Sequence, residues 1–585
     1  MCFGAAPPNS LVERDVATGN AVTVIGELVA NGFFILAWQS GSRVMAVARG
    51  SPSRNLRILT WLCLSARLGS VSLAFVFPYV FVPAVHARPP RHRHSRPSVI
   101  VVENARAGTT AWVGPEASAS SIEGYASEVS VAPGEDLHFH ISARPAARYR
   151  IEVFRLGWYG GLGARRLACL PECSSGEQGV AQPLPPPPSG DRAVPVRANW
   201  PVTDVLRVRR RWVSGYYEAR FVLTSGDQAG RGSVTYFVVQ APPARHSQLL
   251  VQVPVNTWEA YNNWGGRSLY SGPTGAGYRV SFDRPYESGN KQTPLAWEIQ
   301  LVRYLERGGY DVSYQTDLDT DRNPGSLLLH RLVMTAGHDE YWTKGIRDGF
   351  ERARDHGVNL AFIGANIGFW QIRYEDAGRT IVEYRKPELD PETDPTLKTV
   401  MFRRLDPPRP ECELRGVNWW GGIGTSHNYT PVASSLTDPW FKNTGFTAAS
   451  ILPGLVGYEW DAVDPTCNAP TATALFHWTG TPTNADAVRY VAPSGAIVFS
   501  AGSLQFSWGL DNFGNHAATP ADPRLQRFMR AALHDLLRPP LPRKGLQMRL
   551  LSGVHSDVRD GVATAARLSL RDRDRLTRVT LVLDA

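Results

Sequence analysis

Three polar and aromatic segments, each directly after an apolar run, contain the side chains best suited to chemistry. The segments are residues 256–266 (NTWEAYNNWGG), 337–342 (GHDEYW) and 364–370 (GANIGFW). His338 and Glu340 stand two positions apart in the second segment. Both can point into one cavity, as a general acid–base pair or as part of a metal site. The alternative for Glu340 is that it caps the helix predicted to begin near Thr343, because acidic residues favour helix N-termini.

Several common chemistries have no motif in the chain. No cysteine follows any of these apolar runs, so a cysteine nucleophile is excluded there. The sequence contains no G-x-S-x-G, no phosphate-binding loop and no H-E-x-x-H, and no G-x-G-x-x-G follows the first run. His338, Glu340, Tyr261, Asn366 and further carboxylates therefore remain as candidates.

The elements that position these residues alternate between strand and helix. Apolar runs predict strands at 249–253, 310–314, 327–334 and 359–363, whereas helical spacing predicts helices at 296–307 and 343–356. This alternation is typical of a parallel, doubly wound sheet, in which ligands bind at the carboxyl ends of the strands. Residues 488–501 are expected to add sheet, and residues 524–537 a closing helix.

The preceding segment has a different pattern. Residues 98–243 contain short alternating strands, separated by turns with glycine and proline, which predicts an all-β sandwich. We therefore expect a β-sandwich at 98–243, an α/β domain at 244–540 and a fragment of a further β module at 541–585.

The charge of the chain is unevenly distributed. The formal net charge is +9, and residues 1–97 carry ten arginines but only three acidic residues. Most of the positive excess thus lies before the predicted domains, which argues against a nucleic-acid-binding protein. Residues 1–87 are predicted to be an export leader: arginines precede the apolar residues 68–84 and then Ala87, a pattern typical of a cleaved secretory signal. A retained membrane anchor at 68–84 is the alternative, and residues 88–97 are predicted to be a basic linker.

Two of the six cysteines lie in the leader. An even number in an exported chain predicts two disulfides, a local one between Cys169 and Cys173 and a longer one between Cys412 and Cys467. Neither spacing is that of a zinc site.

Five motifs, in order along residues 102–537, together resemble the catalytic large subunit of N,N-dimethylformamidase. The motifs are residues 154–165 (FRLGWYGGLGAR), 256–266 (NTWEAYNNWGG), 282–286 (FDRPY), 337–342 (GHDEYW) and 506–511 (FSWGLD). The resemblance implies an immunoglobulin-like β-sandwich followed by a doubly wound α/β domain similar to class I glutamine amidotransferases. It also implies hydrolysis of a small linear amide by water that a mononuclear, ferric iron activates.

The resemblance further implies a ligand set of two tyrosine phenolates and one glutamate. Glu340 and Tyr261 match two of these ligands, and the third matches a tyrosine of residues 214–217. We expect Tyr217 rather than Tyr216, since adjacent strand residues face opposite ways and only one can bind. The cleft is then expected between the two domains.

The resemblance assigns other roles to the remaining polar residues: His338 matches a histidine beside the iron ligands, and Asn366 and Glu459 match groups that position substrate and water. Phenolate and carboxylate oxygens suit Fe(III) better than zinc.

Three points stay open at this stage. The formamidase pairs its large chain with a small subunit, which this chain does not encode, and a homo-oligomer is the other assembly considered. A cell-surface or carbohydrate-binding module, with Trp258, Trp264 and Trp342 stacking on sugars, is the first alternative function. A glycosidase that uses Glu340 with Glu459 is the second.

Overall fold

The computed structural model describes six stretches of the chain in full and four short strands by their backbone. The full stretches are residues 97–288, 292–422, 424–467, 472–481, 483–514 and 519–538, and the short strands are β1 (Phe33–Ser40), β2 (Arg43–Gly50), β27 (Arg549–Leu550) and β28 (Leu568–Ser569). The predicted signal or anchor at 68–84, and residues 88–96 of the predicted linker, lie outside the described residues. No helix in the described part is long and apolar enough to cross a membrane.

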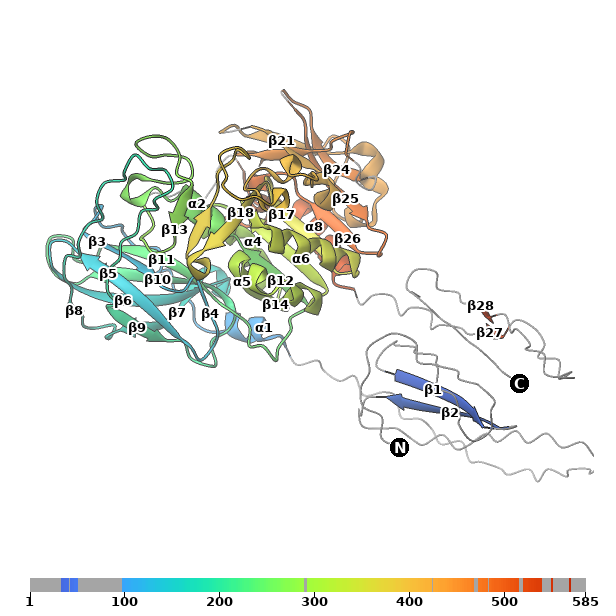
Figure 1. Cartoon of the computed structure of the whole chain (residues 1–585), viewed down its shortest axis with the longest axis horizontal. Helices are drawn as coiled ribbons and strands as arrows, with labels where there is room; N and C mark the ends of the chain where they lie inside the picture. Colours follow the sequence, from blue (N-terminus) through green and yellow to red (C-terminus); the bar gives the residue numbers. More distant parts are fainter. Residues whose placement is uncertain are drawn as a thin grey trace, which may run out of the picture. The chain divides into compact units, whose positions relative to one another are not determined.

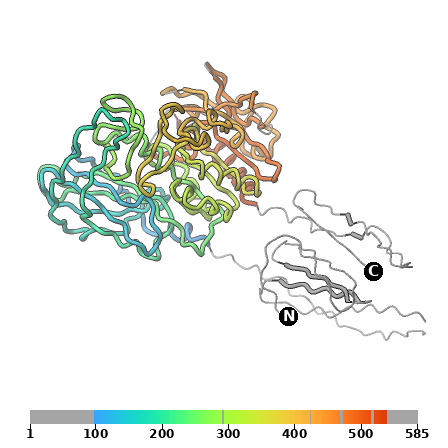
Figure 2. The backbone as a smooth tube through the Cα atoms, in the orientation of Figure 1, coloured from blue at the N-terminus to red at the C-terminus, as the bar shows by residue number. Residues whose placement is uncertain are grey.

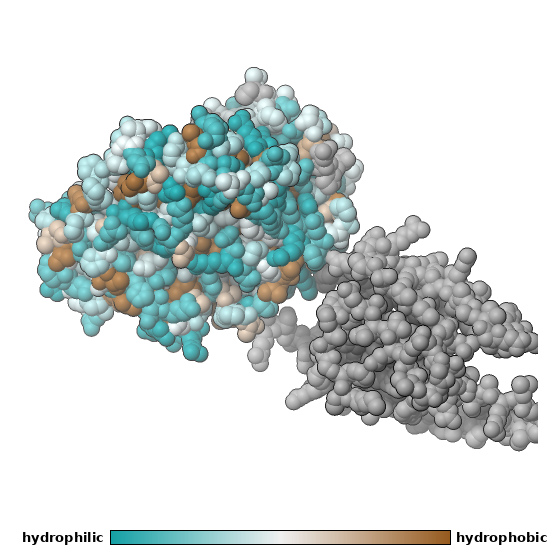
Figure 3. Space-filling model, in the orientation of Figure 1, coloured by the Kyte–Doolittle hydropathy of each residue, from teal (hydrophilic) through white to brown (hydrophobic). Residues whose placement is uncertain are grey.

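His94–Pro539 forms one compact unit, and Figure 2 traces its chain from the β-rich first part to the later α/β part. On the face drawn in Figure 3, its surface is mostly hydrophilic, with hydrophobic residues scattered between polar ones.

After the short helix α1 (Val99–Asn104), two β-sheets enclose a common core. The first sheet has the order β4-β11-β10-β6-β7, with β8 beside β6, and the second has the order β3-β5-β9. Their bounds are β3 (Ile122–Ala126), β4 (Ser130–Val131), β5 (Asp136–Ala143), β6 (Arg148–Leu156), β7 (Ala164–Leu170), β8 (Glu177–Gln178), β9 (Asp204–Arg207), β10 (Gly215–Leu223) and β11 (Gly232–Val239). Phe139 of one sheet packs against Phe221 of the other, with ring centroids 5.7 Å apart. Alternate residues of each strand fill this core, as the sequence pattern predicts.

The later part contains a nine-stranded sheet of order β14-β12-β15-β17-β26-β25-β24-β21-β22 (Figure 1). The first five strands are parallel and the last four antiparallel. Their bounds are β12 (Leu249–Val253), β14 (Val312–Thr316), β15 (Leu332–Gly337), β17 (Asn359–Gly364), β21 (His427–Pro431), β22 (Leu452–Val456), β24 (Thr473–Trp478), β25 (Ala485–Val491) and β26 (Ile497–Ser500). Smaller sheets are formed by β13 (Arg279–Ser281), β16 (Tyr341–Thr343), β18 (Trp370–Glu375) and β19 (Thr380–Val382), and by β20 (Asn418–Gly421) with β23 (Trp460–Ala462).

Helices cover both faces of the large sheet. The helices are α2 (Val255–Tyr261), α3 (Pro294–Trp297), α4 (Ile299–Arg307), α5 (Asp317–Arg322), α6 (Lys344–Asp355), α7 (Cys412–Arg415) and α8 (Pro523–Leu536). Residues of α6 share a core with Leu250 and Val333, whereas α4 and α8 share another with Leu249 and Met334. Successive strand residues thus face opposite helix layers, which is the doubly wound arrangement that the alternation predicts.

Two predicted elements differ from the structure. The single helix predicted over 296–307 is divided at Glu298 into α3 and α4. The apolar run 327–334 contains the end of a 3₁₀ turn (Pro324–Leu329) before β15 begins at Leu332. Apolar residues serve both the turn and the strand here, so hydrophobicity alone does not mark their boundary.

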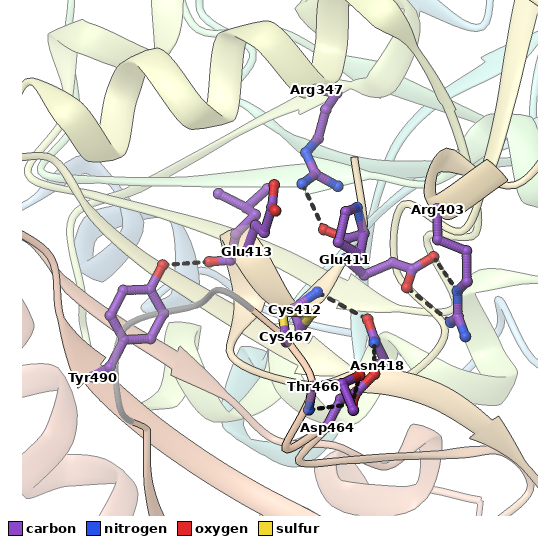
Figure 4. Close-up of a disulfide and its surroundings, with 12 residues drawn as sticks. Arg347, Arg403, Glu411, Cys412, Glu413, Asn418, Asp464, Thr466, Cys467 and Tyr490 are labelled. Atoms are coloured by element: carbon purple, nitrogen blue, oxygen red, sulfur yellow. Dashed lines mark hydrogen bonds and ion pairs between the residues drawn. A yellow bond between two sulfur atoms is a disulfide. The ribbon is translucent and has the colours of Figure 1, made fainter. Parts of the chain in front are cut away.

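Both predicted disulfides are formed, with Cα–Cα distances of 5.1 Å for Cys169–Cys173 and 6.3 Å for Cys412–Cys467. The second fastens α7 to the loop that follows β23 (Figure 4). Around it, Asn418 accepts from the backbone N–H of Cys412 (3.0 Å) and donates to Asp464 (2.8 Å). The bridged segment includes residue 459, so this disulfide restrains the part of the chain that supplies Glu459.

Candidate active site

The carboxyl ends of β12, β15 and β17 bring the three polar segments together. Tyr261 is the last residue of α2, which follows β12. Glu340 lies between β15 and β16, and Asn366 follows β17. The side chain of Thr257 in α2 accepts a hydrogen bond from the backbone N–H of Glu340 (3.0 Å), and the backbone N–H of Trp370 donates to the carbonyl of Glu340 (3.1 Å). Glu340 is therefore held by its backbone from two sides.

Two phenols converge on the carboxylate of Glu340. The Tyr261 hydroxyl donates to Oε2 at 3.0 Å, and the Tyr270 hydroxyl lies 3.1 and 3.0 Å from Oε1 and Oε2. The two rings stack with centroids 4.1 Å apart. Thr343, not Glu340, caps α6 by accepting from the N–H of Ile346. The carboxylate of Glu340 thus serves the pocket, and the capping alternative does not apply.

Tyr217 does not join this pocket. It lies on β10 inside the sandwich core, stacks on Trp212 with centroids 5.4 Å apart, and donates its hydroxyl to the carbonyl of Val213 at 2.7 Å. Tyr216 faces the other side of β10 and packs on Trp258 and Tyr314. The expectation that Tyr217 sits beside Tyr261 and Glu340 is therefore wrong, and so is the expected cleft between the domains: Tyr261, Tyr270 and Glu340 all belong to the α/β part.

Tyr270 is the residue that the sequence argument missed. It lies nine positions after Tyr261, in the loop that continues the first polar segment. Proximity to that segment was its one sequence signal, because the loop has no regular period from which a facing direction follows. The backbone N–H of Leu269 donates to the carbonyl of Ala260 (3.0 Å), which turns the loop back towards α2.

Two buried arginines hold this loop in place. Arg284 pairs with Glu259 of α2 and donates to the backbone carbonyls of Asn262 (2.8 Å) and Arg267 (2.7 Å). Arg267 in turn donates to the carbonyls of Asp191 (2.6 Å) and Val194 (2.8 Å) in the sandwich part. The FDRPY motif at 282–286 thus has a positioning role, since its arginine fastens the loop that carries Tyr270.

His338 is fixed in one tautomer. Gln292 Oε1 accepts from the indole N–H of Trp297 (3.0 Å) and lies 3.1 Å from His338 Nδ1. Because a carbonyl oxygen only accepts, Nδ1 must carry the proton and Nε2 is left with its lone pair. Nε2 lies 3.4 Å from Glu340 Oε2 and 3.8 Å from Glu459 Oε1. The predicted juxtaposition of His338 and Glu340 is therefore confirmed.

Asn366 and Glu459 complete the pocket. Asn366 adopts a left-handed backbone, with φ of 54°, and its backbone N–H donates to Asp461 (3.0 Å). Its side-chain amide donates to Glu459 Oε2 at 2.8 Å and lies 3.5 Å from His338 Nε2. Its Oδ1 is buried without a partner among the described residues. A left-handed asparagine and an unpaired buried oxygen both indicate a functional position.

Burial shapes the electrostatics of this pocket. Desolvation raises the pKa of the Glu340 carboxyl, which the nearby Arg385 partly offsets, and desolvation with the charge of Glu340 raises the pKa of Glu459. The same two causes hold the pKa of the Tyr261 and Tyr270 phenols well above their usual value. Desolvation lowers the pKa of His338 to about 3, so its imidazole is neutral. Each group is pushed towards its uncharged form.

These donors fit a hard cation. Within the described part of the chain, no group of three His, Cys, Asp or Glu side chains could hold a metal ion. Tyrosine supplies the remaining oxygens: both phenol oxygens lie within 3.1 Å of the Glu340 carboxylate. Neither Glu340 nor Glu459 has an ion pair with Lys or Arg among the described residues. Anionic oxygen ligands suit Fe(III), whose charge would favour their deprotonation.

Fold and pocket together define an α/β protein with an oxygen-donor site at the carboxyl ends of its parallel strands. Residues 150–519 match the family described as N,N-dimethylformamidase beta subunit-like, C-terminal. The match spans more than half of the chain, so this chain belongs to that family. No curated protein matches it.

Proposed function

We propose that this chain is an iron-dependent amidohydrolase that cleaves the C–N bond of a small linear amide with water. The supporting observation is the convergence of Tyr261 and Tyr270 on the buried carboxylate of Glu340, while neither Glu340 nor Glu459 forms an ion pair with a lysine or arginine among the described residues. Family membership agrees with this reading.

Tyr261, Tyr270 and Glu340 would hold the ferric ion, with Tyr270 in the place for which the sequence suggested Tyr217. When bound, the ion supplies Lewis acidity, which polarises an amide carbonyl and lowers the pKa of water. The protein residues fix what surrounds that chemistry: Arg284 and Arg267 position the loop of Tyr270, and the backbone contacts of Glu340 orient its carboxylate.

His338 and Asn366 handle the proton and the substrate oxygen. The tautomer fixed by Gln292 leaves the lone pair of His338 Nε2 facing the pocket, where it would accept a proton from water and return it to the leaving amine. Asn366 donates an N–H near the same nitrogen, where it can stabilise a developing oxyanion. Glu459 orients the Asn366 amide through their 2.8 Å hydrogen bond.

A spectroscopic experiment tests this proposal. Phenolate bound to Fe(III) gives a visible charge-transfer band, so the purified full-length chain should be coloured after iron loading and release amine from formamides. Tyr270→Phe should remove or shift the band and abolish amine release. Tyr217→Phe, the matched control in the sandwich core, should keep both. A colourless, iron-free protein after loading, or a band that is unchanged in Tyr270→Phe, contradicts the proposal.

The alternative functions lack structural support. Trp258, Trp264 and Trp342 are 1%, 7% and 0% exposed, so they fill the core and present no rings for sugar stacking. The expectation that they form a carbohydrate-binding surface is therefore wrong. A glycosidase would use Glu340 and Glu459 but leaves the two phenols without a role.

Three further properties belong to the same proposal. Export, through the predicted leader, would place the site and both disulfides in an oxidising compartment. The sandwich would be immunoglobulin-like, and the doubly wound part similar to class I glutamine amidotransferases. The family description speaks of a beta subunit, so a separate partner subunit would accompany the chain. Size-exclusion chromatography of the purified chain alone, compared with its activity, tests that last point.

A further inference from the structure

A second cavity lies where β10 and β11 of the sandwich meet segments of the α/β part. Its volume is about 250 Å³, and it is lined by the segment 112–123, strands β10 and β11, residues 286–288 with 293 and 295, and Phe513. None of Tyr261, Tyr270, Glu340 or His338 lines it. The proposed amide hydrolysis therefore gives this cavity no role.

Strand alternation decides which side chains reach the cavity. On β10, Tyr217, Ala219 and Phe221 point into the sandwich core, so Glu218 and Arg220 point to the opposite face. In the antiparallel register, Glu218 pairs with Tyr236 and Arg220 with Val234. All four line the cavity.

Glu218 is buried there and forms no ion pair with a described residue. Its residue is 1% exposed, and its Oε1 has no hydrogen-bond partner among the described residues. Arg220, the nearest guanidinium along the strand, donates to the backbone carbonyl of Pro115 instead. Desolvation raises the pKa of Glu218 to about 8, an effect that Arg220 partly offsets. A buried carboxylate in this state is costly unless a cation or a donor meets it.

The rest of the lining favours a positive charge with an apolar body. Four glutamates line the cavity against one arginine: Glu116, Glu123, Glu218 and Glu287 against Arg220. Aromatic rings form its walls, namely Trp112, Tyr236, Tyr286 and Phe513. Ring faces attract cations and also bury apolar groups. Glu116, Glu287 and Ser288 are exposed, so the acidic rim meets solvent.

We propose that this cavity binds a small organic ammonium ion, with its N–H groups donating to the Glu218 carboxylate and its apolar body between the aromatic walls. A metal ion fits less well, because Glu218 is the one buried carboxylate among the described lining residues, whereas a hard cation prefers several charged oxygen ligands. A neutral ligand would not offset the cost of ionising Glu218 in the cavity.

Titration calorimetry with benzylammonium on the full-length chain tests this site, with benzyl alcohol as the neutral counterpart. We expect benzylammonium to bind at least about ten-fold more tightly than benzyl alcohol, because only the cation can form a charge-assisted hydrogen bond with the Glu218 carboxylate. Glu218→Gln, which keeps the shape and removes the charge, should weaken benzylammonium by about ten-fold or more. Ala119→Trp, at an exposed position of the lining, should block entry without disturbing the core.

Glu340→Gln separates this cavity from the proposed active site: benzylammonium affinity should be unchanged in that variant. Circular dichroism of each variant checks that it is folded. Equal affinity for benzylammonium and benzyl alcohol, an undiminished affinity in folded Glu218→Gln and Ala119→Trp, or loss of binding in Glu340→Gln would each overturn the proposal. So would the absence of benzylammonium binding at about 10 mM.

Discussion

Two buried clusters of charged residues differ in whether an oppositely charged side chain neutralises the carboxylate. Arg155 of β6 and Glu306 of α4 are 0% and 2% exposed and form two hydrogen bonds, of 2.7 and 2.9 Å. Tyr314 and Asn104 donate to the remaining lone pairs of Glu306 at 3.2 and 2.8 Å. In the pocket, equally buried Glu340 and Glu459 meet phenols, an amide and a neutral imidazole.

The difference separates a structural cluster from a functional one. A paired and fully hydrogen-bonded charge joins two parts of the fold and has nothing left to bind. An uncompensated carboxylate pair costs free energy, and a pocket that keeps it is suited to a cation. The FRLGWYGGLGAR motif belongs to the first kind, because its Arg155 joins the sandwich to α4 rather than touching the pocket.

The strongest test of this comparison removes the charge at the centre of the pocket. Glu340→Gln should lower kcat/KM by about 10³-fold and abolish iron binding, because one anionic ligand is lost. In the iron-free proteins, its thermal midpoint should stay equal to that of the wild type or rise, since a desolvated charge disappears. Amine release and metal analysis measure the first effect and calorimetry the second. A large loss of stability would mean that Glu340 is structural.

The matching change in the structural cluster is Arg155→Ala. Leaving Glu306 buried without its partner should lower the free energy of unfolding by about 3–5 kcal/mol. Urea unfolding measures this loss, and Arg207→Ala, at an exposed pair with Asp136, serves as the control with a loss of about 0–1 kcal/mol. Similar losses in the two variants would remove the contrast between buried and exposed pairs.

Asn366 allows a finer test within the pocket. Asn366→Gly keeps the left-handed backbone but removes the amide, so kcat should fall by about 10²-fold while the visible iron band remains. Steady-state kinetics and absorption spectra give the two readouts. If the band is lost together with the activity, Asn366 holds the metal site rather than the substrate.

The smallest expected effect concerns Glu218, which the comparison places with the uncompensated carboxylates. Its pKa of about 8 in the folded chain, against an ordinary 4.5, means that the folded state binds the proton more tightly. Wild-type stability should therefore fall as the pH rises from about 4.5 to about 8. Glu218→Gln removes this dependence, so its advantage in unfolding free energy should grow by about 2 kcal/mol between pH 6 and pH 8. Thermal unfolding across this pH range, with Glu287→Gln as exposed control, measures it. An advantage that does not grow with pH contradicts the assignment.

Local pattern was enough for much of the fold. β12 and β17 occupy the predicted positions within one residue, and α6 begins one residue after its predicted start, behind its Thr343 cap. Strands and helices of this kind carry their own period, so the sequence marks them. His338 and Glu340 were likewise predictable, because their two-residue spacing at a strand end constrains both side chains.

Local pattern did not predict which side of β10 faces the sandwich core, or the path of the loop after α2. Alternation shows that Tyr216 and Tyr217 point to opposite sides, but only packing decides that Tyr217 enters the sandwich core. Tyr270 reaches Glu340 because Arg284 and Arg267 hold its loop in place. Arg267 does so through the carbonyl of Asp191, which lies 76 positions earlier in the chain.

By itself, the sequence determined the family, the two disulfides, the order of strands and helices, and the His338–Glu340 pair, since these depend on short-range spacing. The tertiary structure alone decided which tyrosine joins Tyr261 at Glu340, and which buried carboxylates form ion pairs. Both depend on contacts between segments far apart in the chain, where the free energy of burial, rather than local conformational preference, selects the partner.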